Sequence, residues 1–259
     1  LIEVLFNLND TRDIYLIRHL FNFLVFFIST ICFYHLINFQ FKNKILSLIG
    51  VLFLILSPRI FAQSFYNSKD IIFLSLMIFA VFFNIKLLNY NGIKYIFLAS
   101  FFSALATALR IPGSYIPIIT IFFYFLNYDK NDHKLSRLKF FLYYFSLFLV
   151  LLYLLWPFLW EDPLTNFLYS FKLLGSIPYS FYTLYLGDFV NTKHIPWHYF
   201  FVWFSISTPP FFLLIIACGF FISAKNFFVN ISFIEEDNKN FLWKNNYEMN
   251  ELFILCVFI

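Results

Sequence analysis

The chain has 259 residues, of which 61% are hydrophobic and 12% are charged. Soluble domains carry about 25% charged residues, so the composition excludes a soluble globular protein and indicates an integral membrane protein. The net charge of +4 comes from Lys and Arg residues spread through the loops, which excludes a nucleic-acid-binding patch.

Apolar runs of membrane-spanning length recur along the whole chain. They predict seven complete transmembrane helices, at residues 15–37, 45–61, 71–88, 95–109, 114–127, 140–158 and 197–224. The sequence Arg110-Ile111-Pro112-Gly113 separates the fourth from the fifth, and Pro209-Pro210 predicts a kink inside the seventh. The predicted fold class is therefore all-α, a polytopic membrane protein.

The two ends of the chain predict a piece of a longer protein. The chain starts at Leu1, not at Met, and an eighth apolar run begins near Leu252 but stops at residue 259. A span needs about 20 residues. We expect residues 1–259 to form a single transmembrane domain that is truncated at both ends.

The longest segment outside the predicted spans is residues 159–196. Within it, Asp162 and Pro163 have the character of an N-cap followed by proline at the first helical position, and Gly175 is a typical helix end. Apolar residues recur between them at helical spacing. The pattern predicts an amphipathic helix at residues 163–175 that lies in the membrane interface.

Lys and Arg are unequally divided between the two sets of loops. Eleven lie on one side and seven on the other, and cytoplasmic loops carry the excess of positive charge. We therefore assign the eleven-residue side to the cytoplasm and the side that holds residues 159–196 to the outer face.

Four outer cations each stand at a helix end or a helix break, and they are Arg18, Arg59, Lys69 and Arg110. Cations at one depth can converge on an anion, and diphosphate is the candidate at a membrane surface. The alternative is that each cation snorkels separately to lipid headgroups. Asp70 follows Lys69 directly; it is either a site residue or a complement to the helix dipole, with Ser68 as the N-cap.

Further polar residues of the outer face are Glu161, Asp162, Asp188, His194 and His198. His194 and His198 have i, i+4 spacing, but Pro196 lies between them and the HExxH pattern is absent, so we expect no metal site. Cys32, Cys218 and Cys256 have no CxxC spacing and are expected to be buried as small hydrophobes. We expect no cofactor.

The stretch Ser57-Pro58-Arg59-Ile60-Phe61-Ala62-Gln63-Ser64-Phe65-Tyr66-Asn67-Ser68-Lys69-Asp70 resembles the second external loop of phospholipid-carrier-dependent glycosyltransferases. These are GT-C enzymes of the branch that includes protein O-mannosyltransferases and aminoarabinose transferases. Four further stretches are similar and stand in the same order along the chain as in such enzymes. They are Arg18-His19-Leu20, Leu109-Arg110-Ile111-Pro112-Gly113, Trp156-Pro157-Phe158-Leu159-Trp160-Glu161-Asp162-Pro163 and Pro196-Trp197-His198-Tyr199. The resemblance covers most of residues 15–225.

The resemblance implies an inverting transfer of a hexose or pentose from a polyprenyl-phosphate-linked donor to a lipid, glycan or protein acceptor. It implies a bacterial inner or plasma membrane, with the reaction on the periplasmic or extracellular face. Arg18, Arg59, Lys69 and Arg110 would bind the donor phosphate, Asp70 would match the second acidic position of the cavity, and Glu161, Asp162, His194 and His198 would line the cavity or the acceptor site. The family's base lies in the first external loop, which would precede Leu1, so the chain by itself is expected to be inactive.

Two other classes remain open at this point. A transporter or lipid flippase would also carry charged helix ends and proline kinks, but it predicts inverted repeats and charges near the midplane. An O-antigen polymerase or ligase is a lipid-linked alternative with a different loop design.

Overall fold

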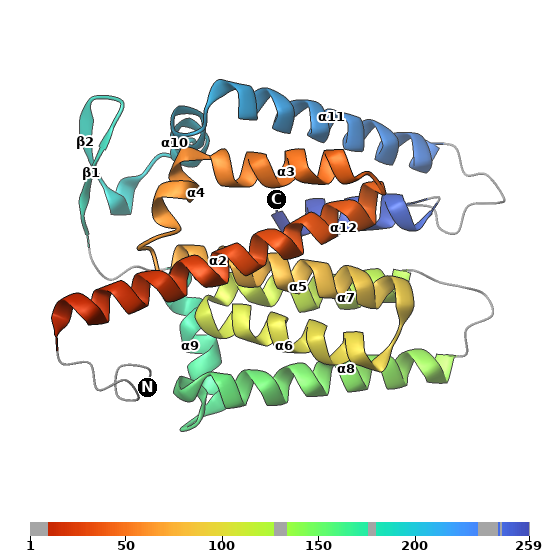
Figure 1. Ribbon diagram of the computed structural model, residues 1–259. Coiled ribbons are helices and arrows are strands. Elements are labelled where there is room, and N and C mark those ends of the chain that lie inside the picture. The colour runs from red at the N-terminus through yellow and green to blue at the C-terminus, as the bar shows by residue number, and fades with distance from the viewer. Residues whose placement is uncertain (1–9, 127–133, 176–179, 233–242, 244, 259) are drawn as a thin grey trace. The chain divides into compact units, whose positions relative to one another are not determined.

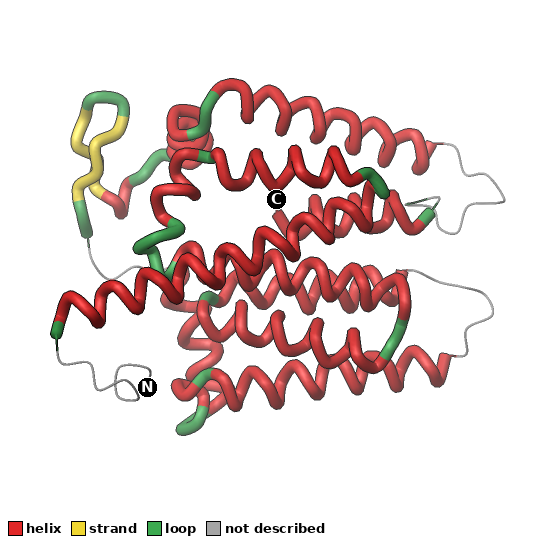
Figure 2. Tube along the Cα trace, in the orientation of Figure 1, coloured by secondary structure: helices red, strands yellow, loops and turns green. Residues whose placement is uncertain are grey.

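The structure is a computed structural model that describes residues 10–126, 134–175, 180–232, 243 and 245–258. The chain divides into two compact units, one formed by residues 1–157 and 245–259 and the other by residues 158–244. Nearly all regular elements are helices, so the prediction of an all-α membrane protein is confirmed (Figure 2).

The first unit is a bundle of helices that run side by side (Figure 1). Helix α5 packs against α2, α6 and α7, and α6 also packs against α8. The elements of this unit are α2 (Thr11–Phe41), α3 (Lys44–Leu56), α4 (Pro58–Gln63), α5 (Asp70–Tyr90), α6 (Ile93–Leu109), η1 (Ile111–Ser114), α7 (Tyr115–Leu126), α8 (Lys134–Leu155) and α12 (Asn246–Phe258).

Small side chains allow α6 to lie close to its neighbours. Its buried residues include Ala99, Ser100, Ser103, Ala104 and Ala106, which suit close helix contact in a membrane. Larger apolar side chains from α5 and α8 fill the space around this surface and form the core of the bundle.

A single buried amide joins four helices of this bundle. The Asn84 side chain, on α5, is fully buried; its Nδ2 donates to Ser103 Oγ on α6 at 3.0 Å. Its Oδ1 accepts from Thr120 Oγ1 on α7 at 2.9 Å and from the Tyr144 hydroxyl on α8 at 2.8 Å. We call these four residues the Asn84 cluster. A buried polar group in a membrane needs such partners because no water is available.

The described residues of the seven predicted spans are mostly helical, but the second predicted span is divided at Ser57, which is extended (φ −62°, ψ 113°), between α3 and α4. Among the described residues, four helices are long and apolar enough to cross a membrane, and they start at Thr11, Asp70, Leu138 and Pro210. Three apolar helices are shorter, at Lys44–Leu56, Ile93–Leu109 and Ile111–Leu126. The expected break after Leu109 is present, because Arg110 is extended (φ −149°, ψ 132°) and η1 follows it.

The second unit contains α9 (Pro163–Gly175), β1 (Tyr182–Tyr185), β2 (Asp188–Asn191), η3 (Thr192–His194), α10 (Tyr199–Ser207) and α11 (Pro210–Ser232). Helix α9 has the predicted bounds, and Thr165 N donates to the Asp162 carboxylate at 3.4 Å, as expected of an N-cap. Its side chains Leu164 and Leu168 are exposed, which suits a helix that lies in the membrane interface.

The antiparallel hairpin of β1 and β2 was not predicted from the sequence (Figure 2). Its two-residue turn is Leu186-Gly187, and both residues have positive φ (52° and 100°), as in a type I′ turn. Leucine is rare at such a position, so the sequence lacks the usual Asn-Gly or Asp-Gly signal of this turn.

Two other expectations need correction. The predicted seventh span is two helices, α10 and α11, because Thr208 before Pro209 is extended (φ −105°, ψ 130°) and ends the first of them. Cys32 is buried as expected, but Cys218 and Cys256 are exposed on their helices, where a membrane protein presents apolar side chains to lipid.

We predict that Asn67 and Asn91 label from opposite sides of the membrane. They flank α5, which has the length and hydropathy of a span. The measurement is maleimide accessibility of single cysteines introduced at either position, after Cys32, Cys218 and Cys256 have been replaced. Thr183, in β1, is expected to label with Asn67. Asn131 is expected to label with Asn91, although it lies outside the described residues. Labelling of Asn67 and Asn91 from the same side would contradict this topology.

Candidate functional site

Asp70 is the first residue of α5, and Asn67 holds it in place. Asn67 Oδ1 accepts from the backbone N–H groups of Lys69 (3.2 Å) and Asp70 (2.9 Å). Asn67 Nδ2 donates to Asp70 Oδ2 at 2.8 Å. The capping interactions therefore come from Asn67, where the sequence suggested Ser68, and they leave the carboxylate of Asp70 oriented by a side-chain amide.

Arg110 forms an ion pair with Asp70. Its Nη2 donates to Asp70 Oδ1, and its guanidinium carbon lies 5.9 Å from the ring centroid of Phe73. The side chains of Arg110 and Asp70 are 43% and 51% exposed, so the pair contributes little to stability. Its consequence is geometric, because the carboxylate has one oxygen bound by Arg110 and the other by Asn67.

The break between α6 and η1 sets the position of Arg110. Gly113 lies against the backbone of α6, where an added Cβ would stand 2.5 Å from the carbonyl carbon of Ala106. Only glycine allows this approach. The backbone N–H of Gly113 donates to the Arg110 carbonyl at 2.9 Å, so the residues of this break form a tight turn that presents Arg110 beside the start of α5.

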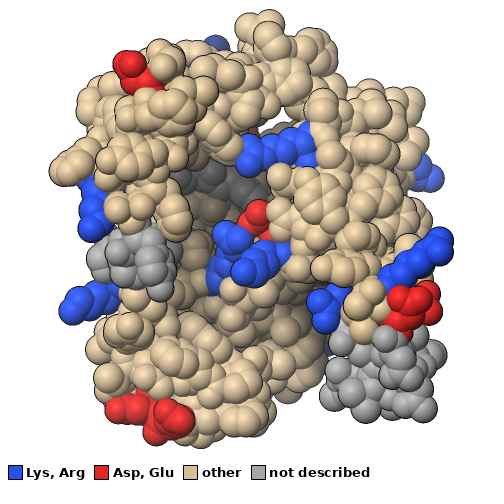
Figure 3. Space-filling model, turned by 90° about the vertical axis from the view of Figure 1, so that its left-hand side faces the viewer, with Lys and Arg blue, Asp and Glu red and all other residues tan. Residues whose placement is uncertain are grey.

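The other predicted cations lie on the same unit. Lys69 precedes Asp70, Arg18 is on α2 and Arg59 is on α4, and all three are exposed. Figure 3 looks onto the end of the molecule where α5 begins and shows Lys and Arg side chains together with acidic ones. The structure brings Arg110 to Asp70; that Arg18, Arg59 and Lys69 converge on one phosphate stays a prediction.

The remaining predicted site residues belong to the second unit. Glu161 and Asp162 are exposed, and Asp162 caps α9. His194 is exposed at the end of η3, and the ring of His198 lies 5.8 Å from that of Tyr185 in the hairpin. Their assignment to a cavity or acceptor site stays a prediction.

Sequence reasoning missed Asn67 as a site residue. Its signal was present, because an Asn three residues before a helical Asp is well placed to accept from the first free N–H groups of the helix. The structure joins three residues, Asn67, Asp70 and Arg110. They fix one carboxylate at the end of a membrane helix and leave guanidinium N–H groups of Arg110 that can bind an anion.

The family model for dolichyl-phosphate-mannose-protein mannosyltransferases matches residues 4–160, which is more than half of the chain and includes Asn67, Asp70 and Arg110. No curated protein sequence and no solved structure matches the chain. The chain therefore belongs to the dolichyl-phosphate-mannose-protein mannosyltransferase family and is a membrane glycosyltransferase of the GT-C type.

Proposed function

We propose that the protein transfers a sugar from a polyprenyl-phosphate-linked donor to a lipid, glycan or protein acceptor on the outer face of the membrane. The family's name points to mannose as the sugar. The observation that carries the proposal is the ion pair of Asp70 and Arg110 at the start of α5, within the residues that match the family.

In this transfer an acceptor oxygen or nitrogen attacks the anomeric carbon, and the bond from that carbon to the phosphate oxygen breaks. The phosphate leaves with the bonding electrons, and a base takes the acceptor proton. Negative charge grows on the leaving phosphate, so fixed positive charge nearby stabilises the transition state. Lys69, Arg18 and Arg59 supply that charge in the proposal, together with the N–H groups of Arg110 that Asp70 does not use.

Asp70 has a positioning role in the proposal. Its carboxylate is held by Asn67 through one oxygen and by Arg110 through the other. From there it orients Arg110 toward the phosphate. If Arg110 were replaced, the carboxylate would remain at the site as an unbalanced negative charge next to an anionic donor.

The test is transfer of mannose from a polyprenyl-phosphate mannose donor by the complete protein in liposomes. Replacing Arg18, Arg59 or Lys69 singly by Gln is expected to raise the donor KM by about ten-fold, because each removes a charge-assisted hydrogen bond. Lys94→Gln is the matched control, since Lys94 is an exposed cation just after the other end of α5.

The same assay distinguishes the alternatives. Unchanged donor KM in the three outer variants would contradict convergence on the phosphate and favour separate contacts with lipid headgroups. Lipid movement across the liposome membrane without any sugar transfer would contradict the transferase proposal and indicate a flippase.

A further inference from the structure

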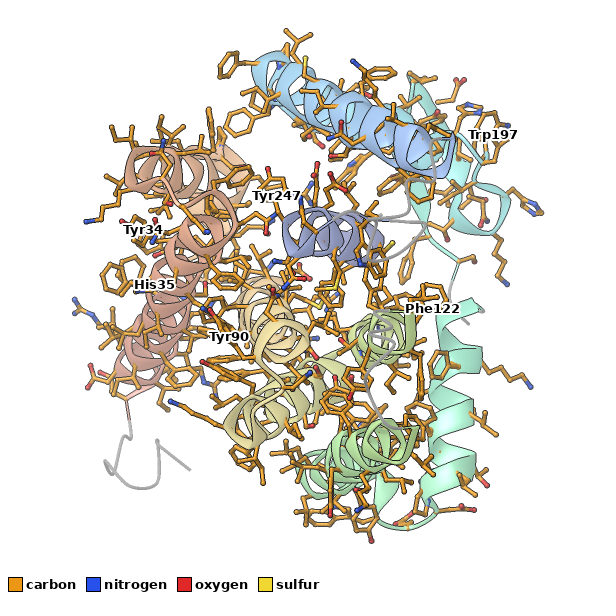
Figure 4. All side chains as sticks on the ribbon, turned by 90° about the vertical axis from the view of Figure 1, so that its right-hand side faces the viewer. Tyr34, His35, Tyr90, Phe122, Trp197 and Tyr247 are labelled. Atoms are coloured by element: carbon orange, nitrogen blue, oxygen red, sulfur yellow. The ribbon has the colours of Figure 1, made fainter. Side chains whose placement is uncertain are left out.

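A cavity of about 660 Å³ lies at the other end of α5, away from Asp70. The ends of α2 and α5 and the start of α12 surround it, and all three belong to the first unit. Figure 4 looks toward this end of the molecule and labels Tyr90 and Tyr247. The lining residues are Phe39, Gln40, Phe41, Lys42, Asn89, Tyr90, Asn246, Tyr247 and Asn250. The proposed transfer does not involve this cavity, and none of the short stretches quoted for the family resemblance lines it.

Aromatic rings form its apolar part. Phe39 packs on Tyr90, with ring centroids 5.9 Å apart, and Phe41 packs on Tyr247 at 5.8 Å. Tyr90, Phe41 and Tyr247 are all exposed. Exposed aromatic residues at the ends of membrane helices mark the level of the lipid headgroups. The cavity therefore opens where a headgroup meets its acyl chains.

Amide side chains fix the polar part of the cavity. Gln40 Nε2 donates to the Tyr247 carbonyl at 2.7 Å, which joins α2 to α12. Asn89 Nδ2 donates to Asn250 Oδ1 at 2.9 Å, which joins α5 to α12. A cavity of this size with a few fixed polar groups has the build of a small-ligand site.

The residues that line the cavity include one cation and no carboxylate, although the Glu251 carboxylate is near enough to Tyr247 to act on it. Lys42 is the cation among the lining residues, and the lining contains no Asp or Glu. Tyr247 also lines the cavity, and a tyrosine hydroxyl is protonated at neutral pH and can donate to a phosphate oxygen.

The backbone of Lys42 adds a second observation. It ends α2 in the left-handed region (φ 52°, ψ 30°), a position where glycine or asparagine is usual. A lysine there carries backbone strain, and strained residues cluster at ligand sites.

We propose that this cavity binds the headgroup of an anionic glycerophospholipid, with its phosphate on Lys42 and its glycerol hydroxyls on the amide groups. The acyl chains extend along the aromatic side chains Phe41 and Tyr90 into the surrounding bilayer. Basic pockets between membrane helices on the Lys-rich side are known to suit such lipids. This binding is separate from the sugar transfer at the Asp70 end.

The test measures the melting temperature of the purified protein in a neutral detergent as phosphatidylglycerol is added. We expect a rise of about 5 °C at saturation. Lys42→Gln is expected to weaken the lipid's apparent affinity about five-fold. Lys42→Gly relieves the strained backbone and is expected to melt no lower than the original protein without lipid, while losing the same affinity.

Lys44→Gln is the matched control because Lys44 is an exposed cation two residues away that does not line the cavity. Its lipid response is expected to equal that of the original protein. Equal affinity in Lys42→Gln and the original protein would overturn the proposal. An equal rise with phosphatidylcholine would overturn the preference for an anionic headgroup, and an equal rise with glycerol phosphate alone would identify a soluble phosphate ligand in place of a lipid.

Discussion

Replacing Asp70 by asparagine is expected to lower the rate of sugar transfer by about 10²-fold or more, the scale of misplacement effects in active sites. Asparagine keeps the shape of the side chain but removes the charge that holds Arg110. A 10²-fold loss corresponds to about 2.7 kcal/mol. Loss of a helix-dipole or capping interaction alone costs at most about 1 kcal/mol of stability, since Asn caps nearly as well as Asp. The two roles are therefore separable by measuring kcat, donor KM and melting temperature together.

Asp10→Asn is the matched control for this change. Asp10 also stands at the start of a membrane helix, and its Oδ1 accepts from Arg12 N at 3.0 Å. It is expected to leave kcat within about two-fold of the original value, because it removes a capping charge without touching the site. Near-original turnover in Asp70→Asn would assign Asp70 to helix capping.

A double-mutant cycle with Arg110→Gln sharpens the result. If Asp70 and Arg110 act as a pair, the double variant should be about as slow as the slower single variant, because the second change removes a partner that is already lost. Strictly additive losses would show that the two residues act independently, and would contradict the positioning role of Asp70.

Asn84→Leu is expected to lower the free energy of unfolding by about 2–4 kcal/mol, because three interhelical hydrogen bonds are lost together. Leucine has a similar size and suits lipid, so the loss comes from the polar contacts to Ser103, Thr120 and Tyr144. The Tyr144 hydroxyl is then left without its Asn84 acceptor in a fully buried position. The measurement is unfolding in mixed micelles of neutral detergent and SDS.

Adjacent tyrosines provide the control for the Asn84 cluster. Tyr144→Phe removes one hydrogen bond and is expected to cost about 1 kcal/mol. Tyr143 is 64% exposed, and Tyr143→Phe is expected to change the free energy of unfolding by less than about 0.5 kcal/mol. If Asn84→Leu unfolds at the same SDS fraction as the original protein, the cluster does not hold the bundle together.

Local signals in the sequence predicted most of the helices and their breaks. Residues within one helical turn predicted three helix boundaries: the start of α9 at Asp162-Pro163, its end at Gly175 and the break at Arg110. The Leu186-Gly187 turn was missed because its sequence departs from the usual turn residues. The separation of α10 from α11 depends on the backbone conformation of Thr208, the residue before Pro209. A Pro-Pro pair in the sequence is compatible with either a kinked helix or two separate helices.

The sequence predicted which residues belong to the candidate site but not which of them contact one another. Lys69, Asp70 and Arg110 were assigned to one outer surface from loop charge alone. That Arg110 binds Asp70 depends on how α5 and α6 pack, and these two residues are forty positions apart. Asn84 gave no signal, because the only partner of its side chain within α5 is the Ala80 carbonyl, which any helical residue has at this spacing. Its side-chain partners come from three other helices.

The Asn84 cluster also ties folding to the order of synthesis. Tyr144 follows Asn84 by 60 residues, so α5 is made well before its last partner exists. At a synthesis rate of about 5–20 residues per second, the amide waits roughly 3–12 seconds with at most a partial set of contacts. A ribosome that stops after α7 leaves a polar group without Tyr144 inside the bilayer. The emergence of α8 therefore supplies the last interhelical hydrogen bond of the Asn84 side chain.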